Sequence, residues 1–421
     1  MNILVVSNLY PPHYVGGYEL ICGRVTQALQ RRGHRVTVLT SNHGLASGAA
    51  APAETGVERT LRLHGFFGHP WLDIRALRGL EFHNNAMLRK AVERVKPDLV
   101  YIWNLGGISK SLLFTLARLG LPTVYYVSDH WIARSLKADV WLDWWNRKNT
   151  QAGPALLRAG WTLTGRRAAC DALAPTNPVR HARFPRIYFC SAALRNLTAA
   201  AGYPVEHGAV IYCPVDTERF HGEAVPADRP LRKLLWVGRL AEDKGVMTAL
   251  KAMRELKGCF AGELHVYGKG EADYTAQLHA FVAENQLSVR FAQATAEEMP
   301  AVYRAHDALL FTSEWEEPFA LTPLEAMVSG LPVIGTTTGG SKELLRHGEN
   351  ALTYRAGDAA ELTTRILELD ANPLLRARLA LTGQTDVARY AEPAIVDQIQ
   401  AYLEETIRTW KPEPPTACDA P

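Results

Sequence analysis

Along most of the chain, short runs that are apolar at nearly every position alternate with longer segments of helical periodicity. A first run at residues 2–8, "NILVVSN", is followed by a helical pattern at 17–33. Further apolar runs of the first half lie at residues 35–41, 97–104, 122–129, 187–192 and 209–216. Runs without polar alternation are typical of strands that are buried on both faces of a parallel sheet. The pattern therefore predicts a doubly wound α/β fold.

The second half of the chain repeats this alternation. Its apolar runs lie at residues 234–240, 263–270, 289–294, 308–314, 331–340 and 350–358, with a helical stretch at 274–286. Proline and charge gather at residues 221–233, which indicates a hinge. We therefore predict two Rossmann-like domains, 1–220 and 221–391. They should face a central cleft in which ligands bind at the carboxyl ends of the strands.

The end of the chain has a different character. Residues 392–411 show helical periodicity, and we expect this helix to pack back on the N-terminal domain. We expect the remaining residues, 412–421, to be disordered, because they carry too little apolar surface to form a core.

The composition is that of an ordinary globular protein. Of 421 residues, 47% are hydrophobic and 21% are charged, which is ample for two cores. The formal net charge of +3, from 46 basic and 43 acidic residues, does not suggest a general nucleic-acid-binding protein. The six cysteines form no C-x-x-C motif and no zinc-site spacing, so we expect free thiols in a reducing compartment.

The lack of a recognisable targeting signal favours the same compartment. The chain opens on a predicted strand and contains no apolar stretch of about 18 residues. We therefore expect neither a signal peptide nor a membrane span. The interpretation is a cytoplasmic protein, and peripheral contact with the inner face of a membrane stays open.

A glycine pair follows the first predicted strand in "SNLYPPHYVGGYE". Gly16 and Gly17 open the helix, where glycines let a ligand approach the backbone N–H groups of a positive helix end. The segment lacks the G-x-G-x-x-G spacing of dinucleotide-binding loops, so a nicotinamide cofactor is not expected. A plain tight turn is the alternative.

Two cations open the second domain in "LLWVGRLAEDKGV". Arg239 ends a predicted strand, and Lys244 follows five positions later at a turn into a helix. A planar guanidinium and a compact ammonium suit the two phosphates of a diphosphate. A cation at a helix start opposes the helix dipole, which favours an anion between the two residues. The alternative is a pair of solvated surface cations.

Two carboxylates, Glu317 and Glu325, lie eight positions apart in "WEEPFALTPLEAM". The segment between them leaves a predicted strand and enters a helix, so several backbone N–H groups should converge there on an anion. These N–H groups belong to Phe319, Ala320, Leu321 and Thr322. Carboxylates accept hydrogen bonds from hydroxyl pairs such as those of sugars and riboses. The segment therefore predicts a sugar diphosphate nucleotide as ligand, with helix-capping acids as the alternative.

These motifs together resemble the retaining glycosyltransferases of family 4, which have the GT-B fold and a C-terminal domain like that of glycogen synthase. The resemblance covers nearly the whole chain and is weakest at 130–186. It is carried jointly by the E-x7-E spacing, by "VGRLAEDKG" and by "EAMVSGLPVIGTTTGG". The resemblance implies transfer of a sugar, with retention, from a nucleotide sugar to an acceptor held by the N-terminal domain.

The resemblance also implies roles for the charged residues. Arg239 and Lys244 hold the donor diphosphate. Glu317 contacts the hydroxyls of the donor sugar, and Glu325 contacts the ribose. No D-x-D motif occurs, and the two cations with the helix dipole can neutralise the leaving diphosphate, so no metal or other cofactor is expected. Glu317 is then a positioning and charge-stabilising residue rather than a general base.

Other parts of the expected site come from elsewhere in the chain. By the resemblance, the loop of Gly16 and Gly17 packs against the phosphates. The nucleotide base lies against the loop after "VRFAQA", near Arg290 and Phe291.

The chain departs from the family at the end of "TVYYVSD". Where the family often has His-Asp, this chain has Ser128 and Asp129, and His130 comes two positions after the expected place. Asp129 and His130 are both candidates to meet the donor sugar, and a structural role is the alternative for the histidine.

The stretch "HWIARSLKADVWLDWWNRKNT" is the part that the resemblance explains least. It holds four of the ten tryptophans among basic residues, and we interpret it as an insertion, at about 130–186, over the cleft. On a helix, Trp141, Trp144 and Trp145 share one face. Indoles there can line the acceptor side, meet a lipid interface or fill the core. The residues assigned to the acceptor side are Tyr18, Trp131, Arg134, Trp144 and Trp145.

The predicted function is a metal-independent, retaining hexosyltransferase. The expected donor is a UDP- or GDP-hexose. The expected acceptor is a glycan, a glycolipid or a small molecule, including a lipid-linked one, in bacterial polysaccharide or glycoconjugate biosynthesis. The alternatives are a catalytically inactive nucleotide-sugar-binding partner protein and a sugar-nucleotide 2-epimerase.

Overall fold

The structure, a computed structural model, describes residues 1–45, 55–147 and 152–412. The tail predicted to be disordered, 412–421, lies almost entirely outside the described residues. Within them, no helix combines the length and the apolarity needed to cross a bilayer.

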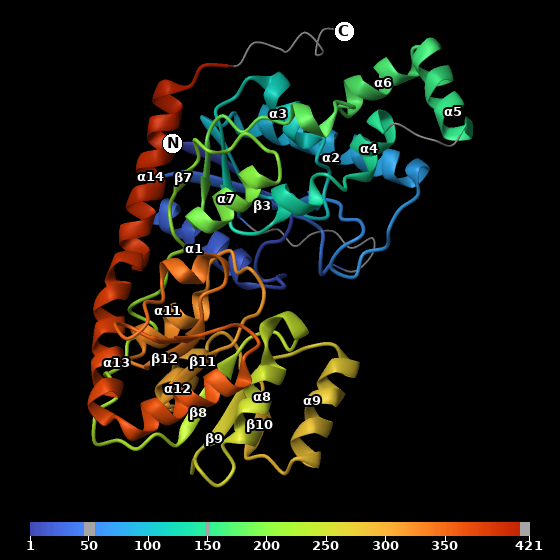
Figure 1. The fold of residues 1–421 in the computed structure, drawn as a ribbon. Helices are drawn as coiled ribbons and strands as arrows, with labels where there is room; N and C mark the ends of the chain where they lie inside the picture. The colour runs from blue at the N-terminus through green and yellow to red at the C-terminus, as the bar shows by residue number, and fades with distance from the viewer. Residues whose placement is uncertain (46–54, 148–151, 413–421) are drawn as a thin grey trace. The chain divides into compact units, whose positions relative to one another are not determined.

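The chain divides into two units (Figure 1). The N-terminal unit comprises Met1–Ile211 and Val396–Pro421, and the C-terminal unit comprises Tyr212–Ile395. Each unit is built on one parallel sheet with crossover helices, which confirms the predicted fold class. The division precedes the domain boundary that the sequence suggested, at 220.

The described part of the N-terminal unit contains a sheet of seven parallel strands in the order β3-β2-β1-β4-β5-β6-β7. The strands are β1 (Asn2–Ser7), β2 (Arg35–Ser41), β3 (Val57–Leu61), β4 (Leu99–Asn104), β5 (Thr123–Val127), β6 (Ile187–Phe189) and β7 (Ala209–Val210). In the centre, Ile3 of β1 lies between Val36 of β2 and Leu99 of β4. The central strands are apolar throughout because crossover helices cover both faces of a doubly wound sheet.

The observed strands differ from the predicted ones at two places. β3 was missed because "VERTL" carries Glu58 and Arg59. Arg59 is nevertheless buried, and its guanidinium donates to the carbonyl oxygens of Tyr10 and Pro11 at 3.1 and 2.5 Å. β7 ends at Val210 and is shorter than the predicted run of 209–216.

The helices of the N-terminal unit include the end of the chain. They are α1 (Gly17–Arg31), α2 (Ile74–Val95), α3 (Leu112–Leu119), α4 (Val140–Asn146), α5 (Ala152–Leu163), α6 (Arg166–Leu173), α7 (Ala192–Ala200) and most of α14 (Glu392–Thr409). The Tyr402 hydroxyl of α14 donates to the carbonyl of Ile187 at 3.0 Å, and its ring lies 5.4 Å from that of Tyr188. Beyond the helix, the Trp410 indole donates to the carbonyl of Gly120 at 2.9 Å. The unit is therefore discontinuous in sequence.

The Trp-rich stretch fills part of the core of the N-terminal unit. Trp131, Trp141 and Trp145 are only 3%, 1% and 4% exposed. The Trp141 indole donates to the carbonyl of Pro175 at 2.9 Å. Trp144 is half-buried, with its ring 4.5 Å from that of Trp145. The structure therefore does not support the acceptor role predicted for Trp131 and Trp145, because a buried indole has no face to offer a sugar.

The described part of the C-terminal unit contains six parallel strands in the order β10-β9-β8-β11-β12-β13. The strands are β8 (Lys233–Val237), β9 (Glu263–Tyr267), β10 (Val289–Ala292), β11 (Ala308–Phe311), β12 (Val333–Thr336) and β13 (Leu352–Tyr354). The helices are α8 (Val246–Glu255), α9 (Ala272–Glu284), α10 (Met299–Arg304), α11 (Leu321–Val328), α12 (Ala359–Ala371) and α13 (Pro373–Val387). Each strand falls on one of the predicted apolar runs.

The segment predicted to be a hinge, 221–233, belongs to the C-terminal unit instead. The backbone N–H of Gly222 donates to the carbonyl of Val328 at 3.4 Å, and that of Val225 donates to Gly330 at 3.0 Å. This proline-containing, charged segment is therefore held to the C-terminal unit by backbone hydrogen bonds.

The strand order reverses once in each sheet, between β1 and β4 and between β8 and β11. The crossover helices that follow the two strands lie on opposite faces of the sheet. The loops at the carboxyl ends of these two strands therefore run in opposite directions. The crevice between them is a common ligand site.

Replacing Trp141 by alanine should destabilise the N-terminal unit by an amount equivalent to about 3–5 kcal/mol, the cost of a large cavity in a core. Trp71→Ala is the matched control, because the Trp71 indole is 63% exposed and surface changes usually stay within about 0.5 kcal/mol. Calorimetric unfolding of the two variants measures the difference. Equal losses would contradict the core assignment.

Candidate functional site

Lys244 and Glu317 meet where the strand order reverses in the C-terminal unit. Lys244 ends a short 3-10 helix, η3 (Glu242–Lys244), after β8, and Glu317 lies in the loop after β11. The Lys244 Nζ atom is 2.5 Å from Glu317 Oε1, and the two side chains are 19% and 11% exposed. Solvent therefore screens this ion pair only in part. The structure brings together two residues that the sequence predicted separately.

Gly245 lets the turn that carries Lys244 approach the end of β11. Its φ is +66°, and a Cβ atom there would lie 1.9 Å from the carbonyl oxygen of Thr312. The Thr312 hydroxyl donates to the carbonyl of Lys244 at 2.9 Å, and the N–H of Glu314 donates to Asp243 at 2.9 Å. A side chain at position 245 would push the lysine away from the carboxylate.

Glu317 is held through one carboxylate oxygen. Its Oε1 accepts from Lys244 and, at 2.7 Å, from the Ser313 hydroxyl. In the part of the chain that the structure describes, no protein donor contacts Oε2. The loop after β12 supports the backbone, because Gly340 N–H donates to the Glu317 carbonyl at 2.7 Å. Gly339 approaches so closely that a Cβ atom would lie 2.3 Å from that oxygen.

α11 begins directly after this loop and carries the predicted anion cradle. Its N-cap is Ala320, and no side chain caps it. The N–H groups of Leu321 and Thr322 therefore depend on water or on a ligand for hydrogen bonds. The side chain of Phe319, in contrast, is buried, with its ring 5.6 Å from that of Tyr390. Phe319 thus contributes packing, and its backbone is the part suited to an anion.

Glu325 lies one turn into α11 and is half-buried. Its Oε2 accepts from the Tyr303 hydroxyl at 2.8 Å. Burial and this carboxylate raise the pKa of Tyr303 well above its ordinary value, so the hydroxyl stays a donor. A tyrosine thus orients the Glu325 carboxylate, which does not cap the helix.

Arg239 is the second cation of this edge. Its guanidinium is 3.8 Å from the carboxylate of Asp243 and is largely exposed, so it can approach an anion. Among the described residues, no group of three or more His, Cys, Asp and Glu side chains is arranged to hold a metal ion.

Arg290 and Phe291 do not lie where the base was expected. Both are residues of β10 itself, not of the loop after it. The Arg290 guanidinium is 2.9 Å from Glu263, the first residue of β9, so it points toward the amino ends of the strands. The Phe291 ring packs 4.2 Å from the His279 ring. Both side chains contact neighbours within the unit, although Arg290 is itself 72% exposed.

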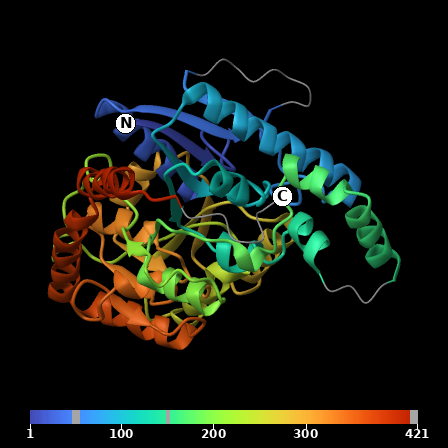
Figure 2. The same ribbon diagram turned by 90° about the horizontal axis from the view of Figure 1, so that it is seen from above.

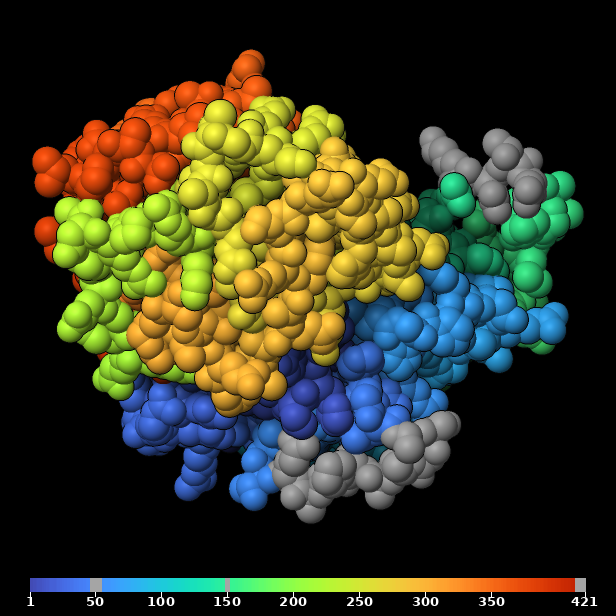
Figure 3. Space-filling model, turned by 90° about the horizontal axis from the view of Figure 1, so that it is seen from below, coloured from blue at the N-terminus to red at the C-terminus, as the bar shows by residue number. Residues whose placement is uncertain are grey.

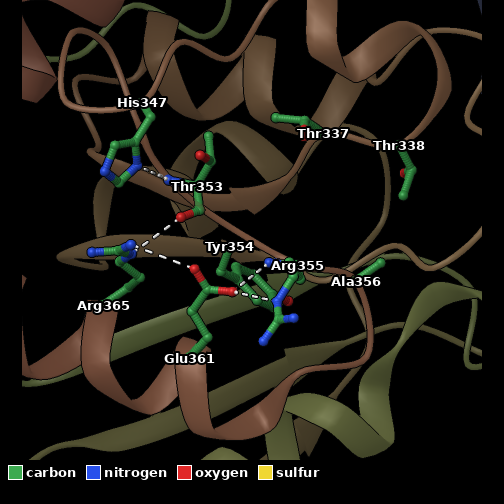
Figure 4. A pocket seen from close by; sticks show the side chains of 9 residues that line it. All are labelled: Thr337, Thr338, His347, Thr353, Tyr354, Arg355, Ala356, Glu361 and Arg365. Atoms are coloured by element: carbon green, nitrogen blue, oxygen red, sulfur yellow. Dashed lines mark hydrogen bonds and ion pairs between the residues drawn. The ribbon is translucent and has the colours of Figure 1, made fainter.

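A polar pocket of about 370 Å³ lies at the carboxyl ends of β12 and β13 (Figure 4). Its lining residues are Thr337, Thr338, His347, Thr353, Tyr354, Arg355, Ala356, Glu361 and Arg365. Arg355 and Arg365 each contact Glu361 at 3.4 Å, so the cations of the pocket are already paired. The Thr338 hydroxyl donates to the Ser313 carbonyl at 3.4 Å. The pocket therefore adjoins the loop of Glu317.

The N-terminal unit has a polar network at its own reversal of strand order. The Asn8 N–H donates to the carbonyl of Asn104 at 2.9 Å, and the Asn8 amide donates to that of Gly106 at 2.7 Å. The Tyr18 hydroxyl donates to Asn8, and the Asn104 amide donates to Asp129. Two asparagines that carry no sequence motif thus join Tyr18 and Asp129, both of which the sequence had predicted.

Asp129 is held firmly in this network. Its Oδ1 accepts from the N–H of Trp131 at 2.8 Å. Burial raises the pKa of Asp129, while its hydrogen bonds and the buried Lys110 ammonium oppose the rise. His130 is buried, and its carbonyl accepts from the N–H of Arg134, whose side chain is exposed. Among these neighbours, Asp129 has the features of a functional carboxyl.

The glycine pair forms the start of α1. Gly16 is the N-cap, and its N–H donates to the carboxylate of Glu19 at 3.0 Å. Glu19 is completely buried, and burial raises the pKa of its carboxyl. Gly17 is exposed at the first helical position. The carboxylate of Glu19 thus takes the N–H groups of Val15 and Gly16, and the exposed backbone of Gly17 remains accessible to a phosphate.

Sequence reasoning missed an aromatic loop between β3 and α2. Trp71 and Phe66 are both exposed, and their rings lie 5.5 Å apart. The loop is held beside the polar network, because the N–H of His64 donates to the carbonyl of Gly107, the residue after Gly106, at 2.9 Å. The loop could have been predicted from the aromatic content of "LHGFFGHPWLD". Exposed indoles are suited to the apolar faces of sugars.

Two family models match the chain. The model described as Glycosyltransferase Family 4 matches residues 15–219, and the model described as Glycosyl transferases group 1 matches residues 232–372. The two matches fall on successive parts of the chain and together take in the strands of both sheets apart from β1.

Curated relatives are similar over part or most of the chain. The lipopolysaccharide core biosynthesis glycosyltransferase LpsE of Rhizobium meliloti is 34% identical over 182 residues, 42% of this chain and 50% of that protein. The glycogen synthase of Mycobacterium tuberculosis is 24% identical over 395 residues, 90% of this chain and 88% of that protein. The matched segment spans about half the length of LpsE. The same holds for the spore coat protein SA of Bacillus subtilis and for the phosphatidyl-myo-inositol mannosyltransferase of Mycobacterium leprae.

Solved structures share the fold. HepE from Anabaena, in complex with UDP and glucose, superposes with a TM-score of 0.66 at 22% identity, over 96% of this chain and 99% of that one. Sucrose-phosphate synthase from Thermosynechococcus elongatus has a TM-score of 0.70 at 18% identity, over 96% and 99%. With two doubly wound units and both family matches, the chain belongs to the family 4 glycosyltransferases and has the GT-B fold.

Proposed function

We propose that this chain transfers a sugar, with retention of configuration and without a metal ion, from a nucleotide sugar to an acceptor. The observation that carries the proposal is the contact between Lys244 and Glu317. There a cation suited to phosphate lies beside a carboxylate suited to hydroxyls, as the two sides of a sugar–phosphate bond require.

In this mechanism, Lys244 and Arg239 bind the donor diphosphate. Together with the first N–H groups of α11, they stabilise the negative charge that develops as the sugar–phosphate bond breaks. Glu317, anchored through Oε1, accepts from the hydroxyls of the donor sugar through Oε2. Glu325, oriented by Tyr303, accepts from the ribose hydroxyls.

The acceptor is assigned to the N-terminal unit. Its hydroxyl attacks the anomeric carbon on the face from which the diphosphate departs, and its proton passes to the leaving phosphate. Retention then needs no covalent intermediate on the protein. Asp129, in its network of asparagines, is the candidate to orient a sugar hydroxyl, and the exposed Trp71 is the candidate to stack on a sugar ring.

The names of similar proteins support a hexose donor and a glycan or glycolipid product. HepE was crystallised with UDP-glucose. The relative from Mycobacterium leprae, 28% identical over 181 residues, is a phosphatidyl-myo-inositol mannosyltransferase. LpsE and the amylovoran glycosyltransferase AmsK of Erwinia amylovora are named for polysaccharide biosynthesis. We therefore propose a UDP- or GDP-hexose donor and a role in bacterial polysaccharide or glycoconjugate biosynthesis.

Thermal unfolding in the presence of a panel of nucleotide sugars identifies the donor, because a ligand of the native state raises its stability. Turnover of that donor with an acceptor would exclude an inactive nucleotide-sugar-binding protein. Epimerisation of the donor without any acceptor would instead show a sugar-nucleotide 2-epimerase.

Alanine substitutions of Glu317 and Glu325 should have different effects on nucleotide binding and on sugar transfer. Glu325→Ala should weaken calorimetrically measured binding of the nucleoside diphosphate by about 1–3 kcal/mol, since a charge-assisted hydrogen bond to the ribose is lost. Glu317→Ala should abolish transfer and leave diphosphate affinity largely intact. Glu316→Ala, which changes an exposed neighbour, is the control and should change neither. Normal diphosphate affinity in Glu325→Ala would overturn the ribose assignment.

Lys244→Ala should lower turnover by a factor on the order of a hundred or more, as loss of a group that stabilises developing charge does. Lys251→Ala removes an exposed lysine of α8 and should leave turnover unchanged. Steady-state kinetics with and without EDTA complete the test. Activity that EDTA removes and manganese restores would show that a metal ion carries the role assigned here to Lys244.

A further inference from the structure

The outward face of α5 is apolar. Leu156 and Leu163 are 72% and 87% exposed, and Ala152 and Ala159 are exposed beside them. These residues recur at intervals of three or four positions, so they share one face of the helix. Figures 1 and 2 both show α5 and α6 projecting from the remainder of the N-terminal unit. We call this face the α5 stripe.

The cation of α5 faces the protein instead of the solvent. The Arg158 guanidinium donates to the carbonyl of Trp144 at 2.7 Å and lies 6.0 Å from the centre of its ring. Trp161 also faces inward, 5.7 Å from the Trp144 ring and 5.8 Å from the Trp145 ring. α5 therefore holds its charge against the unit and exposes its leucines, the reverse of an ordinary surface helix.

An exposed apolar stripe of this kind marks a contact with another molecule. Its border is positive, because Arg166 at the start of α6 is exposed. The acids nearest to α5 in sequence are already paired: Asp171 lies 2.7 Å from Arg118, and Asp143 lies 3.6 Å from Arg147. Leucines bordered by a cation match the acyl chains and phosphates of an anionic lipid surface.

We propose that α5 docks the protein on an anionic bilayer. Leu156 and Leu163 enter the boundary between headgroups and acyl chains, and Arg166 lies at the lipid phosphates. The helix needs only shallow immersion, since its inward face keeps its contacts with the tryptophans of α4. This inference does not depend on the proposed reaction.

A second copy of the chain is a poorer occupant of the α5 stripe. The helix has 12 residues and is therefore about 18 Å long. A stable dimer needs about 800 Å² from each partner, more than two leucines and two alanines on one helix face provide. A bilayer sets no such minimum, because apolar immersion and attraction to anionic lipid add together. Figure 3 shows the atoms of this projection, in green, at the margin of the N-terminal unit beside the blue of α2.

The test is flotation of the full chain with vesicles. Vesicles of phosphatidylglycerol and phosphatidylcholine in equal amounts should carry the protein, and vesicles of phosphatidylcholine alone should carry much less. The double variant Leu156→Glu/Leu163→Glu should lose binding by a factor on the order of ten or more, because both anchors become anionic. Arg166→Glu should reduce binding to the anionic vesicles, and raised salt should do the same.

The matched control is Leu374→Glu/Leu381→Glu on α13, where the two leucines are 78% and 62% exposed. This control should float as the unmodified protein does. Unchanged unfolding temperature would show that both double variants are folded. Flotation of the α5 double variant with anionic vesicles at the unmodified level would overturn the proposal. So would failure of the unmodified protein to float, or light scattering that shows a dimer lost in that variant alone.

Discussion

Parallel strand pairing is the constraint on which the chemistry of this protein depends. When every strand runs in one direction, each crossover helix returns the chain to the amino edge, and all loops that leave strands lie at the carboxyl edge. Residues far apart in sequence then become neighbours. Lys244 and Glu317 are separated by 73 positions and still share a hydrogen bond. In the N-terminal unit, Asn8 and Asn104 meet for the same reason.

The ion pair at the C-terminal edge bears on both the stability of the unit and the chemistry proposed for the site. Two opposite charges with little exposure cost less together than either would alone, since each offsets the lost hydration of the other. The contact also fixes Glu317 through one oxygen before any ligand arrives. Ser313 adds a neutral donor to the same oxygen. A preorganised carboxylate binds hydroxyls without a further ordering cost.

The sequence predicted every described strand of both sheets except β3, because strands buried on both faces leave a continuous apolar run. It could not decide the direction of single side chains. Arg290 looked suited to a nucleotide base, but its position in the register of β10 turned it toward Glu263. Trp145 and Trp144 are adjacent and chemically identical, and only packing buries one more than the other. No sequence motif predicts the network of Asn8 and Asn104, because each is a single amide side chain at the end of a strand.

The discontinuity of the N-terminal unit has a consequence for how the protein is made. The contacts of Tyr402 with β6 and of Trp410 with the loop after α3 come from residues near the end of the chain. A ribosome releases these residues only after the whole C-terminal unit, Tyr212–Ile395, has been synthesised. Domains usually fold in the order in which they emerge, but here the first unit to emerge is the last to be completed. Until α14 has emerged, the surface of the N-terminal unit that receives it is uncovered.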